Sequence, residues 1–184
     1  MQNVLTKIAK WGAALIGGIA LTACSKVVSF VEEVEIDGKT YQVERKEYFE
    51  QQPIQLEWRY RWLESEIYVK DSELPRWRGN LSPMYIGKAK DGSLILVTLI
   101  RGSQNWAERG SPRNWYVGFK LDQKKWIEVP VPLEFEGQRA SFMMGIAAES
   151  GEKQLITKTD REFRNKIDAP GRAGRVELSL PTQR

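Results

Sequence analysis

The chain has 184 residues, enough for one well-packed domain and few for two, and it contains no histidine and one cysteine. Those counts exclude a Ser-His-Asp or Cys-His catalytic pair, a histidine metal cluster, an intramolecular disulfide and a CxxC redox or zinc pair within this chain. With 41% hydrophobic and 28% charged residues the chain can bury a core, and its formal net charge is +4.

The first 23 residues predict an export signal. Residues 1–10 carry Lys7 and Lys10 and no acid, and residues 11–23 carry no charge. This uncharged run is too short to span a bilayer as a helix, which takes roughly 20 residues. A basic segment followed by an apolar segment and a processing site is the order found in signal peptides, so we expect a helical signal segment over residues 1–23.

Leu21-Thr22-Ala23-Cys24 resembles the lipobox of bacterial lipoproteins at every position. In that family the cysteine thiol receives a diacylglyceryl group through a thioether, a peptidase cleaves before the cysteine, and the new amino group is acylated. The resemblance implies that Cys24 carries this covalent lipid and that the bilayer is a partner. We expect no cofactor besides this lipid. Because Ser25 is not the aspartate that commonly retains such proteins at the inner membrane, we favour a location at the outer membrane, facing the periplasm. Lys26 leaves retention at the inner membrane as an alternative.

Cleavage before Cys24 would leave 26 Lys and Arg against 24 Asp and Glu, a net charge of +2 rather than +4. The basic character therefore belongs largely to the signal, and neither compartment nor charge favours nucleic acid as a partner. Charge is uneven along the rest: residues 24–75 carry −5, residues 76–152 carry +3 and residues 153–184 carry +4. These charges either pair within the fold or leave a basic surface for anionic lipid headgroups or an acidic partner.

We expect residues 24–30 to form a lipidated N-terminus and short tether, followed by a single β-rich domain over residues 31–184. Asp37-Gly38 predicts a two-residue type I′ turn that pairs Ile36 with Lys39 and Val34 with Tyr41. This pairing separates two sets of side chains. The apolar face holds Val34, Ile36, Tyr41 and Val43, and the polar face holds Glu33, Glu35, Thr40 and Gln42.

Large apolar residues alternate with charged ones from Leu56 to Trp62, which predicts a strand, and residues 63–71 could form a short helix. Asp91-Gly92 predicts a second two-residue turn that pairs Lys90 with Ser93 and Ile86 with Val97. The residues that follow, 94–100, are apolar on both faces, which is typical of a central strand covered on both sides.

The remaining expected elements are mostly short strands. We predict strands over 115–121, 126–131, 140–147, 154–159 and 176–180, a short helix over 160–167, and loops over 102–114 and 168–175. Together these elements predict a mainly β fold, a single antiparallel β-sandwich or partly open barrel, after the N-terminal helical signal segment.

Two aromatic and cationic segments are candidate binding sites. Arginine and tryptophan dominate binding hot spots because the indole buries much area and guanidinium makes bidentate hydrogen bonds. The candidates are Trp106, Arg109, Arg113 and Trp115 in the segment 101–116, and Arg76, Trp77 and Arg78 in a second cluster. Alternatively, Trp106 and Trp115 fix their loop to the core, and residues 76–79 form a turn with one buried tryptophan.

No catalytic site emerges from the sequence. Ser150-Gly151-Glu152-Lys153 fits S-x-x-K but lacks the accompanying elements, and Glu134 with Glu136 cannot be singled out among 24 acidic residues of residues 24–184. We therefore expect no catalytic residue, no metal ligand and no enzymatic activity.

The expected function is that of an envelope lipoprotein whose β-rich domain binds another protein of unknown identity. In size and architecture alone it resembles accessory factors of envelope complexes and periplasmic immunity proteins. The alternative is a glycan-binding or peptidoglycan-binding lipoprotein that uses the loop aromatics.

Overall fold

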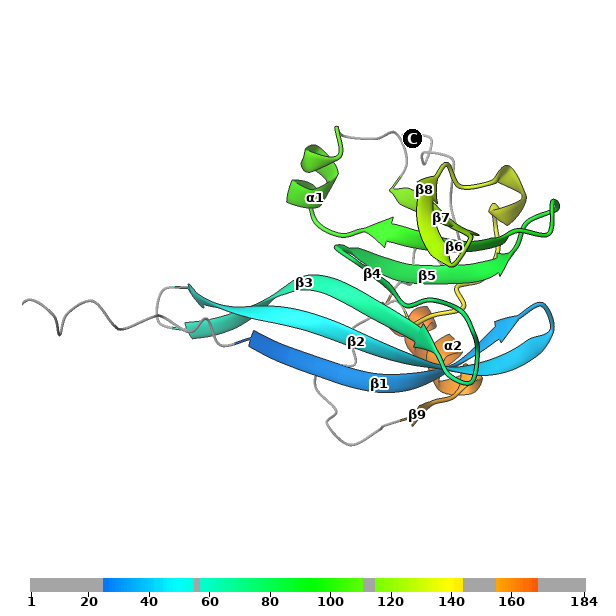
Figure 1. Cartoon of the computed structure of the whole chain (residues 1–184). Helices are drawn as coiled ribbons and strands as arrows, with labels where there is room; N and C mark the ends of the chain where they lie inside the picture. The colour runs from blue at the N-terminus through cyan, green and yellow to red at the C-terminus, as the bar shows by residue number, and fades with distance from the viewer. Residues whose placement is uncertain (1–24, 55–56, 111–114, 144–154, 169–184) are drawn as a thin grey trace, which may run out of the picture.

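The computed structural model describes residues 25–54, 57–110, 115–143 and 155–168, with the side chains of 52–59 and 166–168 outside that description. The predicted signal segment and Cys24 therefore lie outside the described residues. The fold is mainly β, with two mostly antiparallel sheets that do not close into a barrel (Figure 1). This confirms the predicted fold class.

The long sheet has the order β4-β3-β2-β1-β9 and the short sheet the order β5-β6-β7-β8. The long sheet consists of β1 (Ser25–Ile36), β2 (Lys39–Ile54), β3 (Glu57–Val69), β4 (Trp77–Gly79) and β9 (Leu155–Ile156). The short sheet consists of β5 (Leu81–Lys88), β6 (Leu94–Ile100), β7 (Tyr116–Asp122) and β8 (Lys125–Val129). The helices are α1 (Ser103–Glu108), the 3-10 turn Leu133–Phe135 and α2 (Lys158–Asp168).

The hairpin of β1 and β2 has the predicted register. Ile36 pairs with Lys39 and Val34 with Tyr41. Asp37 and Gly38 have φ values of 53° and 72°, as a type I′ turn requires, and glycine tolerates this conformation best. The predicted apolar face is buried against the short sheet, which explains why this register is strongly specified.

The second hairpin differs from its prediction by one residue. Ile86 pairs with Leu96 instead of Val97, and pairing ends at Lys88 and Leu94, so the loop is Ala89–Ser93. The carboxylate of Asp91 accepts hydrogen bonds from the backbone N–H (2.9 Å) and the hydroxyl (2.5 Å) of Ser93, which stabilises this longer turn. Asp-Gly therefore marks the turn here but not its length.

Residues 63–69 continue strand β3, so the predicted short helix over 63–71 is wrong. Ser65, Ile67 and Val69 are buried and alternate with Glu64, Glu66 and Tyr68, of which Glu66 is also buried and paired with Arg76. The strand period of two is therefore partly hidden by a buried charge, which explains why the sequence also allowed a helix. The predicted helix over 160–167 is confirmed as α2. The predicted loop over 102–114 contains α1, and its residues 111–114 lie outside the described residues.

The last predicted strands are only partly described. Residues 140–143 are not in a strand, and the rest of 140–147 is not described. The strand expected over 154–159 is reduced to Leu155–Ile156, which pairs with β1 in parallel, because α2 begins at Lys158. The segment 176–180 and residues 169–175 lie outside the described residues. As expected, β6 is an interior strand, buried on both faces.

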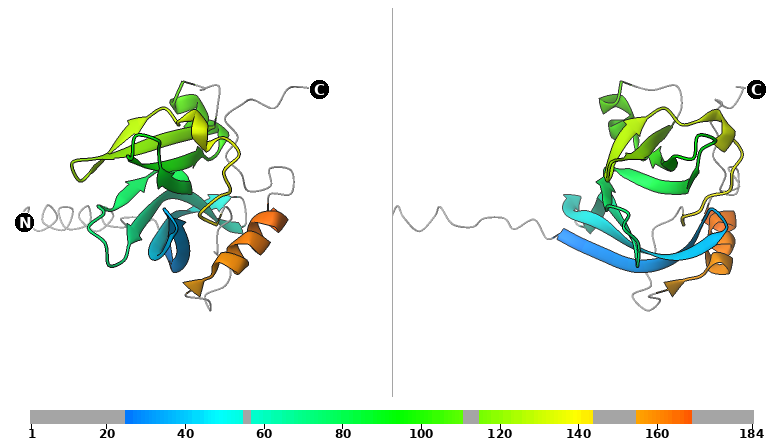
Figure 2. Two further views of the ribbon diagram at one scale, coloured as in Figure 1. Left: turned by 90° about the vertical axis from the view of Figure 1, so that its right-hand side faces the viewer. Right: turned by 45° about the vertical axis from the view of Figure 1, so that its right-hand side comes forward.

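Residues 25–30, expected as a tether, belong to strand β1 instead. Ser25 pairs with Glu50 and Phe30 with Arg45, and the Phe30 side chain is buried. Pairing with β2 thus continues to the first described residue. At that end the long sheet extends past the short sheet, whereas α2 lies beside β1 at the other end (Figures 1 and 2).

The main core lies between the two sheets. It is formed by Val34, Ile36, Val43, Ile67, Val69, Trp77, Leu81, Ile86, Leu96, Ile100 and Phe142. A second cluster on the other face of the short sheet is formed by Met84, Ile95, Val97, Tyr116, Phe135 and Ala140. Burying apolar area at about 25 cal/mol per Å² drives this packing.

Candidate functional site

A fully buried ion network lies between the sheets, next to the main core. Arg45 on β2 contacts Glu32 on β1 at 3.1 Å and Glu47 on its own strand at 2.5 Å. Its guanidinium also donates to the carbonyl oxygen of Met143 at 2.7 Å and lies 5.5 Å from the ring centre of Phe30. Arg45 therefore joins β1 and β2 to a segment about 100 residues further along the chain.

The two carboxylates of this network have further hydrogen bonds. Glu47 accepts from the hydroxyl of Ser65 at 2.7 Å and from the indole N–H of Trp62. Glu32 accepts from the backbone N–H of Met143 at 2.7 Å. Burial raises the pKa of Glu32, and this effect exceeds the opposing attraction of Arg45. The network is a well-satisfied structural element that joins the two layers.

Arg101 extends the buried charge toward the surface. Its guanidinium lies 5.4 Å from the ring centre of Trp62. Burial lowers the pKa of Arg101, and the nearby positive charge of Arg45 lowers it further. Arg101 belongs to the predicted site-like segment, and the structure places it at the border between the ion network and a surface groove.

This surface groove, called the α1 groove here, has a volume of about 480 Å³. It lies between β3 and α1 and receives Trp62 and Leu63 from one side and Gln104 and Glu108 from the other. It is lined by Arg61, Trp62, Leu63, Asn80, Arg101, Gly102, Gln104, Asn105 and Glu108. Asn105 of α1 donates to the carbonyl oxygen of Asn80 at 3.2 Å, which fixes the helix over the groove.

Within the described residues, the outer edge of β3 has no strand partner beside the α1 groove. Strand β4 pairs only with residues Ser65–Ile67 of β3, and at Asn80 the chain leaves the long sheet for β5. Among the described residues, no strand pairs with the outer edge of β3 from Glu57 to Glu64. The unpaired backbone groups of such an edge are a template for another strand.

The structure brings Trp106 and Trp115 together. Their rings stack with centroids 5.6 Å apart and planes 15° apart, and both pack against the main core. This arrangement matches the alternative in which the two tryptophans fix the loop to the core. Arg109 contacts Glu128 of β8 at 3.1 Å, whereas Arg113 and Cys24 lie outside the described residues.

The second predicted cluster is divided between core and surface. Trp77 is only 3% exposed and belongs to the main core, as in the alternative of one buried tryptophan, although it lies in strand β4. Arg76 and Arg78 are exposed and lie over the rings of Tyr68 and Tyr48 at 5.0 and 4.4 Å. They also form ion pairs with Glu66 and Glu64, so they already have partners within the fold.

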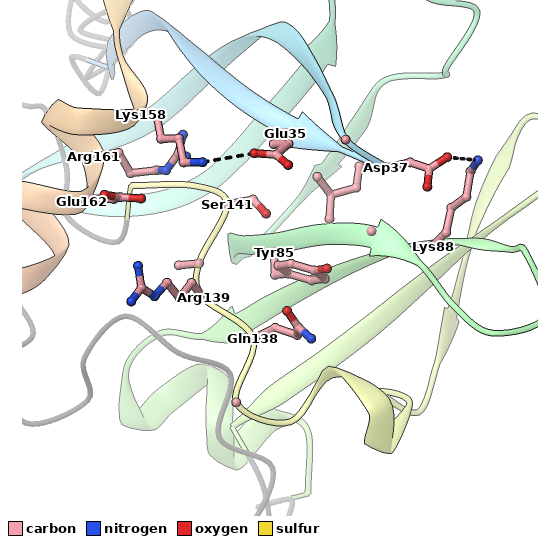
Figure 3. Close-up of a pocket in the computed structure, with 15 residues that line it drawn as sticks. Glu35, Asp37, Tyr85, Lys88, Gln138, Arg139, Ser141, Lys158, Arg161 and Glu162 are labelled. Carbon is pink, nitrogen blue, oxygen red and sulfur yellow. Dashed lines mark hydrogen bonds and ion pairs between the residues drawn. The ribbon is translucent and has the colours of Figure 1, made fainter.

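A polar pocket of about 590 Å³ lies between the β1–β2 turn, β5, residues 137–141 and α2 (Figure 3). Lys158 contacts Glu35 at 3.1 Å and Lys88 contacts Asp37 at 2.5 Å across its rim. The hydrogen bond and charge of Lys88 lower the pKa of Asp37. These exposed pairs contribute little to stability but give the pocket a strongly polar lining.

Arg161 of α2 borders this polar pocket. One of its terminal nitrogens donates to the carbonyl oxygen of Glu33, and its Nε is buried without a hydrogen-bond partner. Burial lowers the pKa of Arg161. Arg139 lies exposed nearby, so the pocket contains polar donors for an anionic or polar group. The sequence did not point to this pocket, because its residues come from four separate segments.

In the part of the chain that the structure describes, no helix is both long and apolar enough to cross a membrane, and no group of three or more potential metal ligands is found. Comparison of the chain with protein-family models, curated proteins and solved structures finds no match.

The buried ion network was missed from the sequence, although a signal for it exists. In β1 the inward positions run Phe30, Glu32, Val34, and in β2 an inward arginine and glutamate follow Val43. A charged residue in an otherwise apolar face of a strand is a sign of a buried ion pair, because unpaired burial is costly.

Proposed function

We propose that this chain is an envelope lipoprotein, acylated at Cys24, whose β-rich domain binds another protein and catalyses no reaction. The lipobox supports the anchor. The α1 groove supports the binding role, because it combines an open strand edge with Trp62 and Arg101, residue types that dominate binding hot spots.

The observation that carries this proposal is the edge of β3 beside the α1 groove, with which no strand of the described ranges pairs. An extended segment of a partner would continue the line of β4, pair with β3 at Trp62–Glu64 beside the groove, and lie beneath α1. Main-chain hydrogen bonds would supply affinity, and side chains of the partner would enter the groove next to Arg101 and Gln104.

Site-specific photo-crosslinking in living cells tests this mode. In one variant a photoreactive residue replaces Leu63 in the groove. In the control variant it replaces Ile127 on β8, whose side chain is 47% exposed. We expect a discrete protein adduct from position 63 and none from position 127. Gln104→Trp, which fills the groove, abolishes the adduct, and Gln138→Trp in the polar pocket retains it.

Two outcomes would contradict the proposal. One is an adduct at position 63 that is insensitive to Gln104→Trp; the other is the absence of any adduct there under several growth conditions. The anchor has a separate test, since Cys24→Ala must remove acyl labelling and membrane fractionation.

The glycan-binding alternative requires a free indole face. Stacking between Trp106 and Trp115 already occupies one face of each ring. It stays a prediction, checked by tryptophan fluorescence on addition of saccharide fragments and by binding to sacculi.

A further inference from the structure

The beginning of β1 determines where a lipid anchor would sit on the domain. Ser25 is already in the strand, and it pairs with Glu50, which in turn pairs with Arg61. Cys24 is bonded to Ser25, and consecutive Cα atoms are about 3.8 Å apart. An acyl group on Cys24 would therefore be attached at the end of the long sheet, with no tether between them.

The long sheet continues beyond the level of this attachment. Strands β2 and β3 remain paired as far as Ile54 and Glu57, three residues past Gln51. At about 3.3 Å per residue the paired strands reach about 10 Å beyond Gln51. Acyl chains inserted in a bilayer from Cys24 would thus bring this end of β2 and β3 to the depth of the lipid headgroups.

The side chains described at this end have the chemistry of a membrane interface. Val27 and Tyr60 are each 49% exposed, and the ammonium group of Lys26 lies 5.2 Å from the ring centre of Tyr60. Arg61 is also exposed and pairs with Glu50 at 3.3 Å. Tyrosine is enriched at membrane interfaces, and lysine and arginine extend their charged groups toward lipid phosphates.

We propose that this end of the long sheet, formed by 25–27, 51–54 and 57–61, contacts the headgroup layer of the bilayer. The inference rests on the proposed acylation of Cys24. Figure 1 shows that this end extends past the short sheet, so the short sheet and α1 do not shield it from a flat surface. The polar pocket lies by the β1–β2 turn, at the opposite end of β1.

A fluorescent label tests the contact on the acylated full chain. Because a thioether would consume the sole cysteine, Tyr60→Cys would provide the single thiol for an environment-sensitive fluorophore. Position 60 is far from Cys24 in sequence. Quenching of a label at position 60 would therefore reflect the position of the folded sheet at the membrane and not the closeness of the label to the anchor along the chain. Ile127→Cys on β8 is the matched control, since these side chains are 49% and 47% exposed.

Both labelled proteins are reconstituted in vesicles of phosphatidylethanolamine and phosphatidylglycerol that contain a headgroup-nitroxide lipid. We expect loss of most of the fluorescence at position 60 and unchanged fluorescence at position 127. Thermal unfolding of each variant confirms that it is folded, and Arg61→Cys replaces Tyr60→Cys if that variant is not.

Mass spectrometry of Cys24 separates the two proposals. Acylated protein whose label at position 60 is not quenched, or is quenched no more than at position 127, overturns the membrane contact and leaves the lipoprotein proposal intact. Unmodified Cys24 overturns both.

Discussion

At the scale of single residues, Arg45 links three segments of the described fold. It neutralises two fully buried carboxylates, those of Glu32 and Glu47, and holds the carbonyl oxygen of Met143. Removing one partner of such a network leaves charges in the core that water cannot reach. The cost of the loss therefore exceeds the net worth of the ion pairs.

Arg45→Met tests this role. Two carboxylates lose their countercharge, and we expect the free energy of unfolding to fall by about 3–5 kcal/mol, measured by urea denaturation. Lys158→Met, which breaks the exposed pair with Glu35, is the control and costs less than about 1 kcal/mol. Equal effects of the two substitutions would show that the buried network is not a structural centre.

The carboxylate of Asp91 should make the stability of the fold depend on pH. Hydrogen bonds from Ser93, followed by Lys120, lower its pKa from 3.8 to about 2. The lowered pKa stabilises the fold above pH 3.8, and this contribution is lost as the pH falls through 2. The difference in Tm between the wild type and Asp91→Asn should therefore be largest near neutral pH and vanish in strong acid.

Ser93→Ala removes the hydroxyl donor to Asp91 and should reproduce part of this pH dependence. A difference in Tm that stays constant from neutral to acidic pH would mean that the carboxylate of Asp91 is not stabilised by the turn.

At the scale of elements, period-two patterns predicted strands well where one face is buried. Val34, Ile36 and Tyr41 specified the register of the first hairpin because a slip of one residue would expose them. In the second hairpin the observed register differs from the predicted one by one residue. Strand β6 is buried on both faces, so its apolar residues do not specify which face points inward. The observed loop is closed by hydrogen bonds to the carboxylate of Asp91 and by backbone hydrogen bonds from Ala89 to Ser93 and from Gly92 to Ala89.

The candidate site was predictable in part. The segment 101–116 was singled out by its residue types, and the structure places its residues Arg101, Gln104 and Glu108 at the α1 groove, whereas the named candidates Trp106 and Arg109 do not line it. The open edge of β3 was not predictable, because it depends on the short length of β4 and on the departure of the chain at Asn80. Likewise, no local pattern indicates that Leu155 pairs in parallel with Val31.

Gly118 tests the pairing of β7 with β8. A Cβ atom at this position would lie 2.9 Å from the carbonyl oxygen of Val129, so the neighbouring strand must move. We expect Gly118→Ala to cost about 1–3 kcal/mol and to increase amide hydrogen exchange throughout β8.

Gly92→Ala is the control for this substitution, because its added Cβ meets open space and its strain is confined to a φ of +81°. It should destabilise the β5–β6 turn without increasing exchange in β8. Unchanged exchange in β8 of Gly118→Ala would contradict close strand contact at this position.

At the scale of the whole molecule, the two ends of the long sheet differ. The end with Ser25 extends past the short sheet and lies next to the proposed anchor, whereas the β1–β2 turn borders the polar pocket and α2 lies beside it (Figures 1 and 3). On a membrane this difference between the two ends would direct the polar pocket away from the bilayer and place the α1 groove between the bilayer and the pocket.

Inserting ten Gly and Ser residues between Cys24 and Ser25 tests this orientation. Acylation should be retained, and quenching of a label at position 60 by headgroup nitroxides should fall to the level at position 127, because the flexible linker releases the sheet. Unchanged quenching would show that the direct connection does not set the orientation.

The ion network also constrains the order of folding. Glu32 and Met143 are 111 residues apart, and Arg45 and Met143 are 98 residues apart. Before residue 143 has folded against β1 and β2, the charged groups of Glu32 and Arg45 lack their hydrogen bonds to the backbone of Met143. Burial of these groups is then more costly, which opposes early collapse of the two strands. Contacts of such large sequence separation also slow folding. A chain that crosses a membrane N-terminus first would complete this core only after most of it had been exported.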